Sequence, residues 1–142
     1  MMDKLVDVSS VAHVIQLAVA PVFLLTGIGA ILGVLSTRLA RVIDRYRVLS
    51  IMEEMERIAH KAEMHNLVTR SRWIHWSIML CTVCALLVCV VIVALFAGAE
   101  MGRDPSLLIA VAFTTAMLAL VAGLVCFLRE IALATGVISR AG

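Results

Sequence analysis

Three long runs of the sequence are apolar and contain no charged residue, and each is long enough to cross a lipid bilayer. They cover approximately residues 11–35, 73–97 and 107–128. A membrane-spanning helix needs about 20 apolar residues. Because the bilayer core offers no hydrogen-bond partners, the backbone in such runs must form helices. The sequence therefore predicts an all-α integral membrane protein with three transmembrane helices, in a single membrane domain that covers residues 1–142.

Composition supports this fold class. The chain has 142 residues, of which 63% are hydrophobic, and its mean hydropathy is +1.07. Soluble domains are about 45–50% apolar, so a soluble core of this size would leave much apolar surface in water. The first run is also longer than the apolar core of a cleavable signal peptide, about 7–15 residues. We therefore expect this run to remain as a membrane helix.

The basic residues predict the orientation of the chain in the membrane. Ten of the twelve Lys and Arg residues lie between the first two runs or after the third, and only Lys4 and Arg103 lie on the other side. Such residues are enriched in cytoplasmic loops. The N-terminus is therefore expected outside and the C-terminus in the cytoplasm. Trp73 and Trp76 fall where the second run meets the cytoplasmic interface, as an aromatic belt requires.

The charged segment 36–72 is predicted to form a long cytoplasmic helical hairpin. The sequence has no Gly or Pro between Gly33 and Gly98, so the first helix can continue into the cytoplasm. Ser50 and Glu53 have the spacing of a capping box, which places a helix start there. A second helix is expected over about 51–65, with Asn66 as its end.

An apolar stripe on this second helix predicts how the hairpin packs. Its members recur at helical spacing, and they are Ile51, Met55, Ile58 and Ala62. We expect the stripe to pack against the outgoing helix, with the membrane surface as the alternative partner. On the outer side, Asp104 and Pro105 predict an N-cap and a first-turn proline for the third span, which should end near Gly136.

The first span carries a seam of small residues at spacings of three and four. The seam consists of Thr26, Gly29, Gly33, Ser36 and Ala40. Small residues let two helix backbones approach closely in lipid, where no hydrophobic effect drives association. Packing within one chain and a helix–helix contact in an oligomer both explain the seam, and the sequence does not choose between them.

A second face of the first helix has the composition of a pore lining. It is weakly polar at the outer end, apolar in the middle and basic at the inner end. Its residues are Gln16, Ala20, Phe23, Gly27, Ala30, Val34, Arg38, Arg41 and Arg45. In a ring of first helices it would form a hydrophobic constriction with a basic vestibule that favours anions. The alternative is that these arginines only anchor the helix at the interface.

The sequence offers no catalytic constellation, so we expect no enzyme, cofactor or metal centre. Cys81 and Cys84 form a CxxC pair within the second span. A thiol or metal site would need further ligands nearby, and packing as small apolar residues is the simpler explanation. The basic segment carries interleaved acidic residues such as Asp44, Glu53 and Glu63. It is therefore typical of a solvated helical surface and not of a nucleic-acid site.

Several sequence runs resemble the bacterial membrane family catalogued as domain of unknown function 2721. The resemblance rests on residues 15–30, IQLAVAPVFLLTGIGA, followed by RLAR at 38–41 and DR at 44–45, and on FLREI at 127–131 with AT at 134–135. It covers nearly the whole chain. It implies a small protein of the bacterial inner membrane, and the family name carries no activity.

Two hypotheses on function follow. In the first, the protein is a homo-oligomer in the inner membrane that conducts inorganic ions, with an anion preference and with the first helix around the axis. In the second, it is a non-conducting scaffold or adaptor whose hairpin at 36–72 binds a partner. Both place the chain in a lipid bilayer, and neither involves nucleic acid.

Overall fold

The part of the chain that the structure describes forms three long helices and one short one. The computed structural model describes residues 2–52, 54–102 and 104–139, with side chains described for residues 8–52, 56, 58–102 and 104–136. The helices are α1 (Met2–Ile51), α2 (Glu54–Ala59), α3 (Lys61–Met101) and α4 (Ser106–Ser139). Three of them, α1, α3 and α4, are long and apolar enough to cross a membrane. The predicted all-α class with three candidate spans is therefore confirmed.

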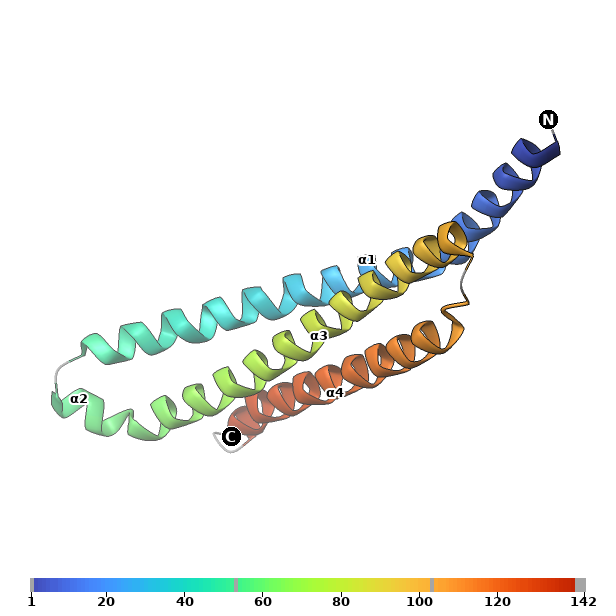
Figure 1. The fold of residues 1–142 in the computed structure, drawn as a ribbon. Helices are drawn as coiled ribbons and strands as arrows, with labels where there is room; N and C mark the ends of the chain where they lie inside the picture. Colours follow the sequence, from blue (N-terminus) through green and yellow to red (C-terminus); the bar gives the residue numbers. More distant parts are fainter. Residues whose placement is uncertain (1, 53, 103, 140–142) are drawn as a thin grey trace.

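The central helix of the bundle is α3, which packs against α1 on one side and α4 on the other (Figure 1). Buried positions recur every seven residues along each helix. On α1 they are Val14, Pro21, Ile28, Leu35, Val42 and Leu49; on α3 Leu67, Ile74, Cys81 and Val88; on α4 Ala116, Gly123 and Glu130. A repeat of seven keeps one seam of an α-helix facing its neighbour when the helices supercoil left-handedly. These seams therefore run from Val14 to Leu49 on α1, from Leu67 to Val88 on α3 and from Ala116 to Glu130 on α4.

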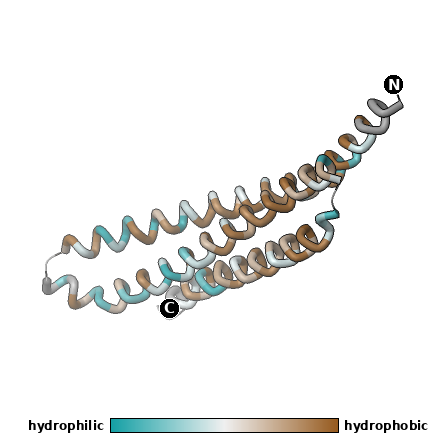
Figure 2. Tube along the Cα trace, viewed as in Figure 1, coloured by the Kyte–Doolittle hydropathy of each residue, from teal (hydrophilic) through white to brown (hydrophobic). Residues whose placement is uncertain are grey.

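The outward faces of the helices are apolar over one half of the bundle and polar over the other. Figure 2 shows brown helices toward the end that holds the α3–α4 connection and teal segments toward the end that holds α2. Large apolar side chains such as Val22, Leu86 and Leu118 are exposed on α1, α3 and α4 respectively. Such a surface suits contact with lipid tails better than contact with water. We call the half of the bundle around α2 the charged end.

The charged end differs from the prediction in its details. The first helix does continue through Arg38 and Arg45 to Ile51, as expected. The second helix predicted over 51–65 is instead split into α2 and the start of α3, with His60 between them. The ring Nδ1 of His60 and its backbone amide both approach the carbonyl oxygen of Glu56, at 3.0 and 3.2 Å. Asn66 does not end a helix, because α3 continues through it to Met101.

The predicted packing of the apolar stripe is wrong for the side chains that can be placed. Ile51 and Ile58 are 78% and 70% exposed, and Ala62 is exposed as well. The breaks on either side of α2 change the register, so Met52, Met64 and Leu67 pack on the core instead. The side chain of Met55 lies outside the described residues. So does Glu53, the second member of the predicted capping box, while the hydroxyl of Ser50 donates to the carbonyl of Arg47 at 2.7 Å.

At the opposite end, the predicted start of the third span is confirmed. The backbone amide of Ser106 donates to Oδ1 of Asp104 at 3.0 Å, so Asp104 caps α4. The amide of Ile109 donates to the carbonyl of Pro105 at 3.0 Å, which places the proline in the first turn. The preceding helix α3 ends at Gly102, whose φ of +60° suits a residue without a Cβ. The C-terminal end of α4 lies at Ser139, beyond the predicted Gly136.

The helices α3 and α4 approach each other closely at Gly123. A Cβ added there would lie 3.1 Å from Sγ of Cys81 and 3.3 Å from Cβ of Leu80. The fully buried hydroxyl of Ser77 donates to the carbonyl of Gly123 at 2.7 Å. The missing side chain therefore lets the two backbones come close enough for an interhelical hydrogen bond between two candidate membrane spans.

We predict that Gly123→Val lowers the free energy of unfolding by about 1–3 kcal/mol, because the new side chain overpacks the contact with Cys81 and Leu80. Thermal unfolding in detergent micelles measures this. Gly136→Val is the matched control, since a Cβ at Gly136 would meet nothing within 4 Å. Equal melting temperatures for the two variants would contradict the assignment of Gly123 as the close contact.

Candidate functional site

Among the described side chains, one carboxylate lies fully buried where the three long helices enter the charged end. It belongs to Glu130 of α4, whose exposed fraction is 0%. Glu130 lies seven residues after Gly123, on the face of α4 that packs against α3. An ionised carboxylate in this position must be paired, because burying an isolated charge costs many kcal/mol.

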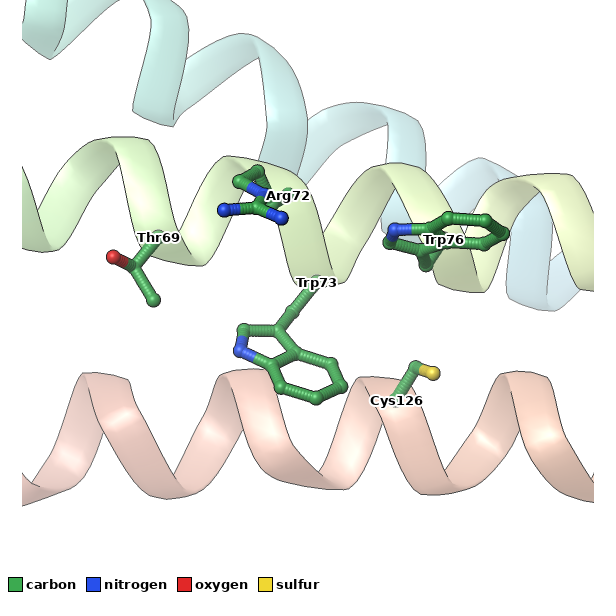
Figure 3. A pocket seen from close by; sticks show the side chains of 5 residues that line it. All are labelled: Thr69, Arg72, Trp73, Trp76 and Cys126. Atoms are coloured by element: carbon green, nitrogen blue, oxygen red, sulfur yellow. The ribbon is translucent and has the colours of Figure 1, made fainter.

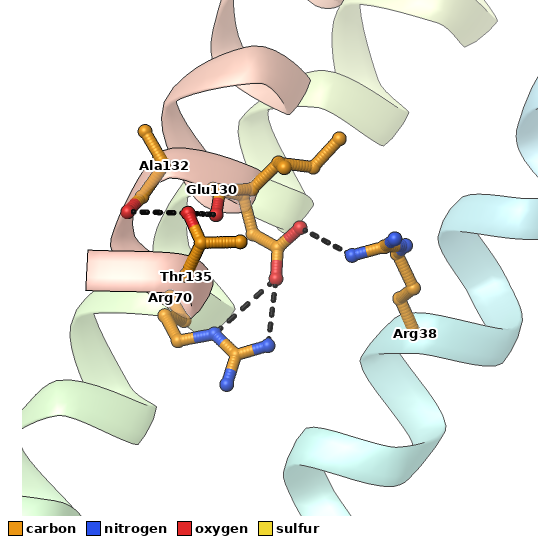
Figure 4. A network of polar contacts seen from close by, with 6 residues as sticks. Arg38, Arg70, Glu130, Ala132 and Thr135 are labelled. Carbon is orange, nitrogen blue, oxygen red and sulfur yellow. Dashed lines mark hydrogen bonds and ion pairs between the residues drawn. The ribbon is translucent and has the colours of Figure 1, made fainter. Parts of the chain in front are cut away.

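Two arginines from different helices pair with this carboxylate (Figure 4). Arg70 of α3 donates from Nε and Nη2 to Oε1, at 3.2 and 2.8 Å. Arg38 of α1 donates from Nη1 to Oε2 at 3.1 Å. Each oxygen of Glu130 is thus held by a different helix. The guanidinium of Arg38 also lies over the ring of Phe127, 5.3 Å from its centroid, where the π-face attracts a cation.

The arginine–carboxylate cluster joins elements that otherwise share little contact. The helices α1 and α4 each pack along α3, and contacts between α1 and α4 are sparse. The bond from Arg38 to Glu130 spans this gap directly. The cluster therefore adds a direct link between α1 and α4 to the packing of both helices on α3.

Next to the cluster, a cleft of ≈ 460 Å³ opens between α1 and α3. Its volume lies within the range of about 300–1,000 Å³ that is typical of small-molecule sites. The lining residues are Arg38, Arg41, Val42, Arg45, Glu63, Asn66, Leu67, Arg70 and Ala134. We call it the arginine cleft. Its floor is apolar, formed by buried Val42 and Leu67, and most of its remaining lining is polar and basic.

One ion pair crosses the outer part of the arginine cleft. Nε of Arg45 donates to Oε1 of Glu63 at 2.8 Å, and this hydrogen bond raises the pKa of Arg45. Both side chains are well exposed, so water screens the pair and its contribution to stability is small. Arg41 is exposed at the same cleft and forms no ion pair with the side chains that the structure describes.

The three residues of the buried cluster lie inside the part of the chain that matches a known family. The profile of the family described as protein of unknown function (DUF2721) matches residues 18–140. The chain belongs to this family. No curated protein and no solved structure is significantly similar to it. The resemblance seen in the sequence is therefore confirmed, and this member of the family shows how the FLREI run contributes: it supplies Phe127 and Glu130 to the cluster.

The two predicted faces of the first helix are both open in this family member. Every residue of the small-residue seam is exposed, and a Cβ added at Gly29 or Gly33 would meet nothing within 4 Å. Packing within the chain therefore does not explain the seam. The predicted pore-lining residues are also exposed, except for Arg38, which is half-buried because it turns toward Glu130.

A second groove lies on the other side of α3, between α3 and α4. It measures ≈ 440 Å³ and is lined by Thr69, Arg72, Trp73, Trp76 and Cys126. In Figure 3 the indole of Trp73 projects toward α4, and Arg72 lies on the same stretch of α3. The two tryptophans mark the level where the apolar part of α3 begins, as the predicted interfacial belt requires.

The cysteines pack within the bundle or along its surface. Cys81 and Cys84 are fully buried in the apolar core beside Ile28 and Val88. Among the described residues, no group of three or more His, Cys, Asp or Glu side chains is placed to hold a metal ion. The packing explanation of the CxxC pair agrees with this environment.

Sequence reasoning missed Glu130, Arg70 and Asn66 as members of one site. Glu130 lies seven residues after Gly123 and so on the same face of α4, but only the structure shows that this face packs on α3. The partners came from helices 60 and 92 residues away in the chain, and no local pattern identifies them.

We predict that Glu130→Gln lowers the free energy of unfolding by about 2 kcal/mol. Breaking a fully buried ion pair costs about 3–5 kcal/mol, and the cost is smaller here because Arg38 and Arg70 are 39% and 24% exposed and so partly screened. Thermal unfolding in detergent micelles measures the loss. The exposed neighbour Arg129→Gln serves as the control, and unchanged stability of Glu130→Gln would refute the pairing.

Proposed function

We propose that this chain is a non-catalytic, homo-oligomeric protein of the bacterial inner membrane that assembles through α1. The observation that carries the proposal is the open small-residue seam on α1. The seam is exposed along its length, and Gly29 and Gly33 have free space where a side chain would lie. In lipid, such a surface gains its energy from close backbone packing against another helix. A second copy of α1 offers a matching surface.

The geometry of α1 supports a ring-like assembly. With about 100° between successive residues, three faces of the helix lie roughly a third of a turn apart. One face, around Ile28, packs on α3. The second carries the seam around Gly33, and the third carries the predicted pore lining around Phe23 and Val34. The helix can therefore contact α3, a neighbouring copy and a central axis at the same time.

We predict that the purified protein in nanodiscs has the mass of an oligomer and that Gly33→Leu shifts it toward the monomer, because the larger side chain separates the helix backbones. Native mass spectrometry measures the subunit number. Ala122→Leu is the matched control, since Ala122 is exposed on α4 and lies away from the seam. A wild-type protein that is strictly monomeric would exclude the proposal.

The further part of the proposal is that this oligomer conducts ions and favours anions. The open face of α1 would supply an apolar constriction, where Phe23 is 73% exposed. Arg41 and Arg45 would supply a basic vestibule on the cytoplasmic side. The outward N-terminus and cytoplasmic charged end follow from the distribution of Lys and Arg.

We predict that Phe23→Ala increases single-channel conductance in planar bilayers, because it widens the apolar constriction and eases its wetting. The matched control is Phe113→Ala, which shortens an exposed aromatic side chain on α4. Wild-type protein that stays silent at every ionic condition and membrane tension would refute conduction and leave assembly intact.

A second candidate function is a membrane scaffold whose charged end binds a cytoplasmic partner. The observation that favours it is the pair of exposed apolar side chains, Ile51 and Ile58, near the turn around α2. Apolar side chains at an interface supply binding energy when a partner removes them from water. Two results together would favour this function over the channel. The oligomer would not conduct, and chemical crosslinking in membranes would capture a partner with the wild type that is lost in Ile58→Arg.

A further inference from the structure

We propose that the arginine cleft is a binding site for a phosphate group. This inference goes beyond the proposed function and does not depend on assembly or conduction. The cleft is formed within one chain by α1, α3 and the end of α4, and it is present next to the buried cluster. The ligand class follows from the charge, the donors and the position of the cleft.

The charge of the cleft is positive after its internal pairs are counted. Four arginines line it, and two carboxylates, Glu63 and Glu130, pair with three of them. Arg38 and Arg70 share the single charge of Glu130, and Arg41 adds its own. Two positive charges therefore remain in excess, which suits a phosphate group, whether a diester with one negative charge or a monoester with up to two.

The donors of the cleft suit the geometry of a phosphate. A guanidinium presents several N–H groups in a rigid planar fork and binds phosphate oxygens in pairs. The N–H groups of Arg41 make no hydrogen bond to a described residue, so all of them are free for a ligand. Arg45 uses only its Nε, which donates to Glu63. Asn66 adds an amide donor from α3 on the opposite wall. The apolar floor of Val42 and Leu67 keeps these donors on one side of the ligand.

The position of the cleft admits two sources of phosphate. Arg38 follows the apolar stretch of α1 directly, and Arg70 precedes Trp73, the first tryptophan of the interfacial belt. The cleft thus begins at the level where lipid headgroups lie and extends away from the membrane. A headgroup phosphate can enter from the bilayer, and a soluble phosphate compound can enter from the aqueous side.

The test uses the full chain in phosphatidylcholine nanodiscs with two probes. Pyrophosphate binding is measured by isothermal titration calorimetry, and retention of phosphatidylglycerol is measured by native mass spectrometry. We expect Arg41→Gln to weaken binding by about tenfold, because it removes charged hydrogen bonds to the ligand. Arg47→Gln, an exposed arginine on the same helix outside the cleft, should leave binding unchanged.

A second variant is expected to change ligand binding in the opposite direction. Glu63→Gln removes a negative charge from the cleft and frees Arg45, so it should strengthen binding by about two- to fivefold. The control is Glu56→Gln, an exposed carboxylate of α2. Thermal unfolding checks that each variant is folded, and the gain in Glu63→Gln cannot come from a folding defect.

The two probes also separate the sources of the ligand. Preferential retention of phosphatidylglycerol that responds to both cleft variants assigns the site to a lipid headgroup. Pyrophosphate binding that responds to them, without lipid retention, assigns it to a soluble phosphate compound. Absence of binding by both probes overturns the proposal, and so does binding that Arg41→Gln and Arg47→Gln affect equally.

Discussion

At the charged end of the bundle, the Glu130 carboxylate bridges the guanidinium groups of Arg38 and Arg70 and so joins α4 to α1 and α3. In lipid, apolar side chains gain little by moving from tails to a neighbouring helix, so polar contacts and close packing decide how helices associate. The contact of α1 with the rest of the chain is one-sided, along α3 alone for most of its length. Packing along α3 positions α1, and the carboxylate of Glu130 adds a direct bond from α4 to α1 at the edge of the arginine cleft.

The same one-sided contact leaves most of α1 open. A helix that spans the membrane beside a single neighbour exposes two further faces, and in this chain those faces differ in composition. One is small and suits another helix backbone, as Gly29 and Gly33 show. The other is bulkier and includes Phe23 and Val34. In the assembly proposed above, this difference between the faces would define which one meets the neighbouring helix, because only the small face permits close approach.

Much of the fold follows from the sequence, because charge-free apolar runs and the Asp104–Pro105 start are local signals. The heptad spacing of buried residues cannot be read from the sequence. The spans are apolar on every side, so the periodic positions do not stand out from their neighbours. The turn around α2 was predicted near Ser50, yet the interruption at His60 and the continuous helix through Asn66 depend on local contacts that have no strong signature. The site was the least predictable part. The sequence alone places Arg38 and Arg41 at the basic end of one face of the first helix. Arg70 and Glu130 become their neighbours only through the packing of α3 and α4.

One continuous helix carries both the arginines of the cleft and the faces that stay open in the bundle. From Arg38 the helix extends about 20 Å toward Ile51 and about 25 Å toward Pro21, at a rise of about 1.5 Å per residue. Buried side chains on both sides of Arg38, such as Ile28 and Leu49, pack α1 against α3 and hold both parts in place. The spacing along α1 between Arg41 and the open faces around Gly33 and Phe23 is therefore set by helix geometry.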